Sequence, residues 1–101
     1  MKLISSRDNA TVKHLHALAT SARERRGSGE TLIDGAHLLG VALERGVQPK
    51  MVVVSESGRG QAEIAALLEA CSAFNCIELP DSLFAHVSPV DAPSGVPAVI
   101  T

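Results

Sequence analysis

The side chains best suited to chemistry in this sequence are positive charges near its N-terminus. Arg23, Arg25 and Arg26 lie within four residues of one another, and Arg7 and Lys13 precede them. A guanidinium group presents a planar fork of N–H donors that matches the oxygens of a phosphate, so this cluster favours binding of a polyanion. The alternative is that the arginine run compensates the negative end of a helix dipole and faces water.

The charge of the chain is divided unevenly between its two parts. Residues 1–26 hold six basic side chains against two acidic ones, and the remaining residues hold three against nine. The net charge of −2 and the isoelectric point of about 6.0 therefore conceal a basic N-terminal element, residues 1–29, on an acidic body. This asymmetry predicts a polyanionic partner at one end of the domain.

The four histidines offer little sign of a metal site. His14 and His16 are two residues apart on a predicted helix, so they face different sides and cannot share an ion. His86 stands apart from the others in the sequence. His37 lies just after a predicted strand, where sites in open α/β sheets gather, so it is the histidine most suited to contact a ligand. An ordinary, partly exposed histidine is the alternative at that position.

No motif in the sequence supports catalysis by this chain. Gly58-Arg59-Gly60 lies between a strand and a helix, as a phosphate-binding turn would, but Glu63 occupies the third glycine position, so we expect a plain turn. Asp34 follows a strand without the acidic pair and lysine that a phosphoacceptor site requires. Cys71 and Cys76 read as buried, reduced thiols. We expect no catalytic residue, bound cofactor or metal here.

The fold is predicted from four short apolar runs that alternate with helical patterns. Met51-Val52-Val53-Val54 is unbroken and bounded by polar residues, which is typical of a central strand covered on both faces. The other predicted strands are 31–34, 76–79 and 98–101, and the predicted helices are 10–26, 36–45, 61–74 and 83–87. This order predicts a three-layer α/β/α sandwich, with a mostly parallel sheet of about four strands.

The predicted helices differ in how much apolar surface they carry. Asp8 or Asn9 can cap the first helix, and Asp81 the last. The first helix has only a thin stripe, formed by Val12, Leu15, Ala19 and Ala22. The second has a wide face, formed by Leu38, Val41 and Ala42 with Leu39 and Leu43 beside them. The basic element is therefore expected to pack lightly on the body.

The sequence also bears on where the chain resides and how it continues. It holds no run of about 18 apolar residues that would span a bilayer and no signal-peptide core, so we expect a cytoplasmic domain. Residues 88–97 contain three of the five prolines and predict an ordered loop or series of turns. The chain stops inside an apolar strand, from which we expect the natural protein to continue.

Several segments together resemble one protein family. They are residues 4–13 (ISSRDNATVK) followed by 15–26, residues 32–35 (LIDG) leading into 41–43, and residues 87–89 with 93–100 (PSGVPAVI). In order and spacing they resemble the N-terminal substrate-binding domain of the SpoU (TrmH-type) RNA 2′-O-ribose methyltransferases. Asp34 stands where the family often has Glu before Gly35, and Ser94 where Gln is common before Gly95.

The resemblance implies a fold and a function for residues 1–101. The fold is similar to that of ribosomal protein L30e, and the partner is structured RNA, either 23S ribosomal RNA or transfer RNA. In the family, methyl transfer belongs to a separate knotted domain, which binds S-adenosylmethionine, forms a homodimer and follows the last strand seen here. None of its motifs occurs in this chain.

Combining the resemblance with the charges gives a set of candidate RNA-binding residues. They are Arg7, Asn9, Lys13, Arg23, Arg25, Arg26, Gly35 and His37. We expect the turn from Gly35 to His37 to line the same edge as the basic helix. Because the chain has no Trp or Tyr, we expect contacts to phosphates, 2′-hydroxyls and shape rather than to stacked bases.

Two other functions fit parts of the sequence. A stand-alone, ribosome-associated RNA-binding protein of the L30e type would have this fold, but the net charge of −2 argues against it. A protein-interaction domain with no RNA role would instead use the basic helix to dock an acidic partner.

Overall fold

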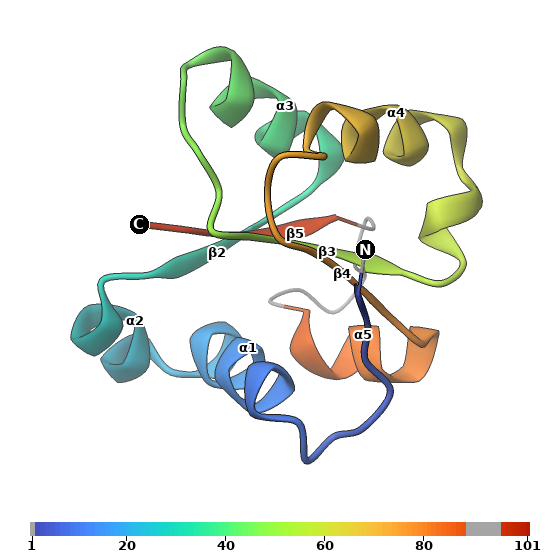
Figure 1. The fold of residues 1–101 in the computed structure, drawn as a ribbon. Helices are drawn as coiled ribbons and strands as arrows, with labels where there is room; N and C mark the ends of the chain where they lie inside the picture. The colour runs from blue at the N-terminus through green and yellow to red at the C-terminus, as the bar shows by residue number, and fades with distance from the viewer. Residues whose placement is uncertain (1, 89–95) are drawn as a thin grey trace.

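Strand β3, Met51–Ser55, lies at the centre of the sheet, as its run of valines predicts. The computed structural model describes residues 2–88 and 96–101 (Figure 1). The other strands are β1 (Lys2–Leu3), β2 (Thr31–Asp34), β4 (Cys76–Leu79) and β5 (Pro97–Ile100). The helices are α1 (Ala10–Thr20), α2 (Ala22–Ser28), α3 (Ala36–Glu44), α4 (Ala62–Ala70) and α5 (Asp81–Val87), and Gly58–Gly60 forms a 3₁₀ turn.

The described strands form one mixed sheet in the order β1-β4-β3-β5-β2. Strands β1, β4 and β3 are parallel, and β5 runs antiparallel to both β3 and β2. The sheet therefore has five strands instead of the predicted four. The strand missed from the sequence is β1, whose Lys2 and Leu3 pair with Ile77 and Glu78.

Helices cover both faces of the sheet, which confirms the predicted three-layer sandwich. In Figure 1 the helices α3 and α4 lie above the sheet, and α1 and α5 lie below it. The side chains of β3 alternate between these layers. The side chain of Val53 packs in the core between the sheet and helices α1 and α5. Those of Val52 and Val54 pack in the core between the sheet and helices α3 and α4.

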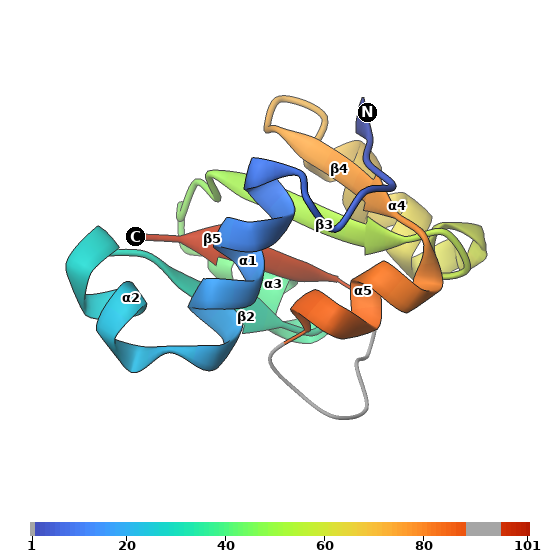
Figure 2. The same ribbon diagram turned by 90° about the horizontal axis from the view of Figure 1, so that it is seen from below.

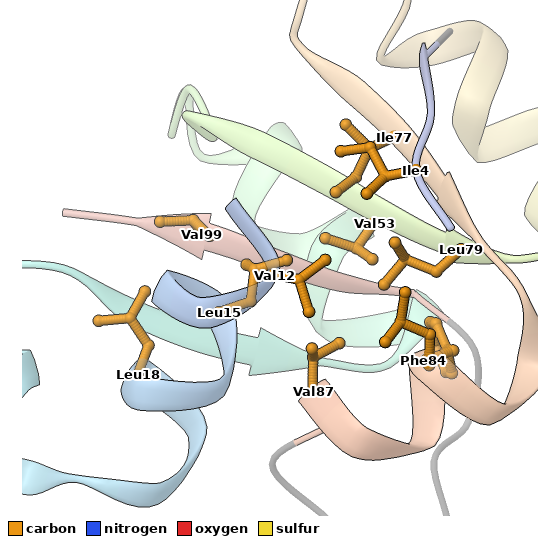
Figure 3. Packing of buried hydrophobic residues seen from close by; sticks show 11 residues of the cluster. Ile4, Val12, Leu15, Leu18, Val53, Ile77, Leu79, Phe84, Val87 and Val99 are labelled. Atoms are coloured by element: carbon orange, nitrogen blue, oxygen red, sulfur yellow. The ribbon is translucent and has the colours of Figure 1, made fainter. Parts of the chain in front are cut away.

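The N-terminal helix is shorter and better packed than predicted. Val12, Leu15 and Leu18 of α1 are almost completely buried against the sheet and α5 (Figures 2 and 3). The expectation of a thin stripe ending in Ala19 and Ala22 is therefore wrong. Leu18 completes the buried face, so α1 is a core helix.

The predicted single helix 10–26 is broken at Ser21. Ser21 has an extended backbone, with φ −129° and ψ 113°, and its hydroxyl accepts from the amide of Glu24 at 3.2 Å. Its own amide still donates to the carbonyl of Ala17 at 2.9 Å, so the residue closes α1 and caps α2. Neither glycine nor proline marks this break in the sequence.

Three smaller predictions are also corrected. Leu38 of α3 is 51% exposed, and Leu39 is the buried residue of that helix, because α3 meets the sheet through a narrower face than its composition indicates. Helix α4 ends at Ala70 instead of extending to residue 74. Asp81 does not cap α5; its carboxylate accepts from the amide and hydroxyl of Ser57, both at 3.0 Å.

Two further expectations concern the proline-rich segment and membrane-spanning helices. The loop predicted at residues 88–97 falls mostly outside the described residues. Within the described ranges, none of the helices is both long and apolar enough to cross a membrane.

Candidate functional site

Helix α2 carries the arginine cluster outside the packed core. None of its residues is buried, and Arg23 and Arg26 are exposed. Gly29 ends the helix in the left-handed conformation, with φ 70°, and its amide donates to the carbonyl of Arg25. Figure 2 shows α2 beside the start of β2, at the rim of the sheet. The segment is therefore held at both ends while its side chains face solvent.

Arg25 has a different role from its neighbours. Its Nη1 donates to the carbonyl of Leu18 at 2.7 Å, and the side chain is half-buried. Leu18 lies in the last turn of α1, where carbonyls have no partner within the helix. Arg25 therefore joins α2 to the end of α1, and only its remaining N–H donors are available to a ligand.

The exposed lysine and arginine side chains of the basic element form no ion pair in the described structure. The ion pairs found there join Lys50 and His14 to Glu30, and Arg59 to Glu78. Two of the three cations of the acidic body are thus neutralised. Across the same described residues, Arg7, Lys13, Arg23 and Arg26 form no such pair, so their charge is available to an external anion.

Glu30 fixes the basic element to the body. Its carboxylate accepts from Nε2 of His14 at 2.7 Å and lies 3.0 Å from Nζ of Lys50. These hydrogen bonds, Lys50 first and then His14, lower the pKa of Glu30. The contact joins α1, the start of β2 and the start of β3, so the rim that bears α2 is held in place.

The predicted residues at the start of α1 lie at the other end of that helix from the arginines. Asn9 caps α1, as predicted, and its Oδ1 accepts from the amides of Thr11 at 2.8 Å and Val12 at 3.4 Å. Arg7 and Lys13 are exposed. Because α1 rises about 1.5 Å per residue, roughly 17 Å separate the two groups.

The turn at Gly35 lies at the opposite end of β2 from α2. Gly35 has φ 120°, a conformation open to glycine, and precedes α3 with His37 exposed in its first turn. Helix α2 adjoins the start of β2, whereas Gly35 follows its end. The four residues of β2, an edge strand of the sheet, therefore separate the turn from the arginines, and a shared role of the turn and the basic helix in RNA binding stays a prediction.

One pair of side chains was missed from the sequence. The rings of His16 on α1 and His86 on α5 stack with centroids 4.1 Å apart and planes 4° from parallel. Nδ1 of His16 donates to the carbonyl of His86 at 2.9 Å. Burial, followed by the charges of His16 and Arg7, lowers the pKa of His86. Because the two histidines are 70 positions apart in the sequence, no local pattern could have paired them.

Other candidate groups are structural. Cys71 and Cys76 carry free thiols, and burial raises the pKa of both, which disfavours the reactive thiolate. Gly58 donates its amide to the buried hydroxyl of Ser55 at 2.9 Å, as part of the plain turn predicted there.

The fold and these charges define a class of protein, an α/β sandwich with an exposed, unneutralised cationic helix at its rim. The chain belongs to the family of MRM3-like substrate binding domains, whose model matches residues 9–98. The match covers α1, α2 and strands β2, β3 and β4, so most of the basic element lies within the family's domain. No curated protein matches the chain.

Solved structures of RNA methyltransferases share this fold. One described as an RNA 2′-O ribose methyltransferase is 26% identical, with a TM-score of 0.80, over 96% of this chain and 36% of that one. An rRNA methyltransferase from Sinorhizobium meliloti is 22% identical, with a TM-score of 0.74, over 98% and 36%. The SpoU methyltransferase AviRb from Streptomyces viridochromogenes, in complex with AdoMet, is 23% identical, with a TM-score of 0.72, over 91% and 32%. The chain thus spans about a third of their length.

Proposed function

We propose that this chain is the RNA-recognition domain of an RNA 2′-O-ribose methyltransferase of the SpoU type, acting on structured ribosomal RNA. The observation that carries the proposal is the α2 surface, defined as exposed Arg23 and Arg26 with no ionic partner among the described residues. In a family of substrate-binding domains, such a surface fits the phosphates of the substrate.

The proposal assigns methyl transfer to another domain of the parent protein. That domain follows this one, binds S-adenosylmethionine and mediates homodimerisation, and the protein works in the cytoplasm. Support comes from solved relatives that are about three times as long, two of which, the Sinorhizobium meliloti enzyme and AviRb, have structures with AdoMet bound. The present chain would position the RNA and take no part in bond making.

The proposed contact is electrostatic, so its strength depends on salt. Each phosphate neutralised by Lys or Arg releases counterions, and log K falls with log salt by roughly 0.7 to 0.9 per contact. Removing two contacts by Arg23→Gln with Arg26→Gln should reduce the slope by about 1.4 to 1.8. Arg25 is left intact in this variant because it joins α2 to α1.

The experiment is a titration of ribosomal RNA fragments at two ionic strengths. Its matched control sets Arg45→Gln against the single substitution Arg23→Gln, because Arg45 is exposed on the acidic body and belongs to none of the ion pairs found among the described residues. We expect weaker binding and a shallower slope only for the α2 variant. Equal losses in both variants would show that net charge, and not this surface, determines binding.

The same titration separates the rival functions. An affinity for RNA that is unaffected by the α2 variant, together with loss of an acidic protein partner, would favour a protein-interaction domain. Tight binding of RNA by the isolated chain that persists at high salt would favour a stand-alone RNA-binding protein.

A further inference from the structure

The stacked histidines of α1 and α5 form a second cluster of groups that could contact a phosphate. His16 and His86 lie face to face at 4.1 Å, and Arg7 is near enough for its charge to act on His86. These groups come from three separate segments of the chain. The turn before α1, α1 itself and α5 therefore converge on one cluster, which is distinct from the α2 surface.

The hydrogen bonding of His16 determines which nitrogen is left for a ligand. A carbonyl oxygen only accepts, so Nδ1 of His16 carries a proton and donates to the carbonyl of His86. Its Nε2 is therefore the ring nitrogen left for a ligand. The carbonyl of His86 lies in the last turn of α5, where the partial negative charge of a helix C-terminus favours a donor such as Nδ1–H.

Among the described residues, no acidic side chain is recorded as acting on His86. The charges that act on His86 are those of His16 and Arg7. On α1, the His14 ring is hydrogen-bonded to Glu30, and Lys13 is exposed. On α5, Asp81 lies at the end of the helix away from His86, and its carboxylate accepts from Ser57. Asp8 is an exposed acid beside Arg7, and Asp34 ends β2, which packs against α1.

We propose that Arg7, His16 and His86 form a phosphate-binding site that holds an RNA phosphodiester and binds it more tightly as His86 becomes protonated. The proposal rests on the RNA-binding function proposed above and adds a second contact point. When no anion is bound, the charge of Arg7 and the adjacent ring disfavour a positive charge on His86. A phosphate that contacts all three side chains would reduce this repulsion.

The predicted pH dependence follows from this repulsion. Without a ligand, burial and the neighbouring charges hold the pKa of His86 below its ordinary value. A bound phosphate stabilises the imidazolium, so binding should raise that pKa. A rise of about one pKa unit corresponds to roughly tenfold tighter binding by the protonated form. RNA affinity should therefore increase as pH falls from 7.5 to 5.5, with about tenfold as the upper limit.

The direct test follows the four histidines of the 101-residue chain by NMR, with inorganic phosphate as the probe. We expect phosphate to raise the pKa of His86 and to shift the ring signals of His16, while the signals of exposed His37 stay unchanged. Arg7→Gln should abolish the effect, and Arg45→Gln should not. A response shared equally by His37, or one that survives Arg7→Gln, would overturn the proposal.

A second arm uses RNA and keeps this inference separate from the proposed function. His86→Asn keeps the backbone carbonyl that accepts from His16 but cannot become cationic, and circular dichroism checks its folding. It should flatten the pH dependence of RNA binding and leave the effect of the α2 variant. If RNA binds through α2 without any pH dependence, this inference fails and the proposed function stands. If phosphate shifts the histidines but RNA does not bind, the proposed function fails.

Discussion

Helices α1 and α2 are consecutive and both basic, yet they do opposite things. Helix α1 buries Val12, Leu15 and Leu18, whereas no residue of α2 is buried. The break at Ser21 separates the two roles, because it lets α1 lie flat on the sheet while α2 is turned out at the rim. Charge content alone would not reveal this. A cationic helix is available to a partner when its other side chains are not needed by the core.

The largest expected effect comes from removing packing under α1. Leu15 is 1% exposed within the core that α1 and α5 share, so Leu15→Ala should lower the free energy of unfolding by about 2 to 5 kcal/mol. Its counterpart on α2, Arg23→Ala, should change it by less than about 0.5 kcal/mol. Urea unfolding measures both. Similar losses in the two variants would mean that α2 is also part of the core.

A smaller effect tests how α2 is ended. Gly29 has φ 70° and Gly27 is helical, and neither has an atom within 4 Å of where a Cβ would stand. Gly29→Ala should therefore cost about 1 kcal/mol through backbone strain alone. Gly27→Ala should stabilise by roughly 0.5 to 1 kcal/mol, since alanine favours a helix. Thermal unfolding compares them, and effects of the same sign would contradict the assigned boundary.

The smallest effect concerns the ionic link at Glu30. Hydrogen bonds from Lys50 and His14 lower its pKa, so its contribution is present above the unfolded value of about 4.5 and is lost as pH falls through the folded pKa. Because both partners are largely exposed, we expect Glu30→Gln to cost at most about 1 kcal/mol at pH 6. In acid the variant and the parent should converge. A constant difference across the pH range would indicate lost packing instead.

Much of the fold could be predicted because it depends on local pattern. The valines of β3 mark a strand covered on both faces, and Thr31–Asp34 and Cys76–Leu79 are strands as predicted. Strand β1 was missed because two residues are too few for any periodicity. The exposure of Leu38 was missed because tertiary packing, and not helix composition, decides which apolar side chains reach the core.

The candidate site was predicted less completely. The arginine cluster is local in sequence, so charge alone identified Arg23 and Arg26. The hydrogen bond from Arg25 to Leu18 depends on the break at Ser21, which no strong signal marks. The stacked histidines come from segments 70 residues apart, and only the folded chain brings them together.

The central claim is that RNA meets the side of the molecule that bears α2. Its most direct test is a map of backbone amide shifts in the 101-residue chain during titration with a ribosomal RNA fragment. We expect the largest amide shift changes at Ala22–Ser28 and at the turn that leads into α1. These changes should become smaller as salt is added. Changes concentrated on α3 and α4, with Ala22–Ser28 unaffected, would contradict the claim.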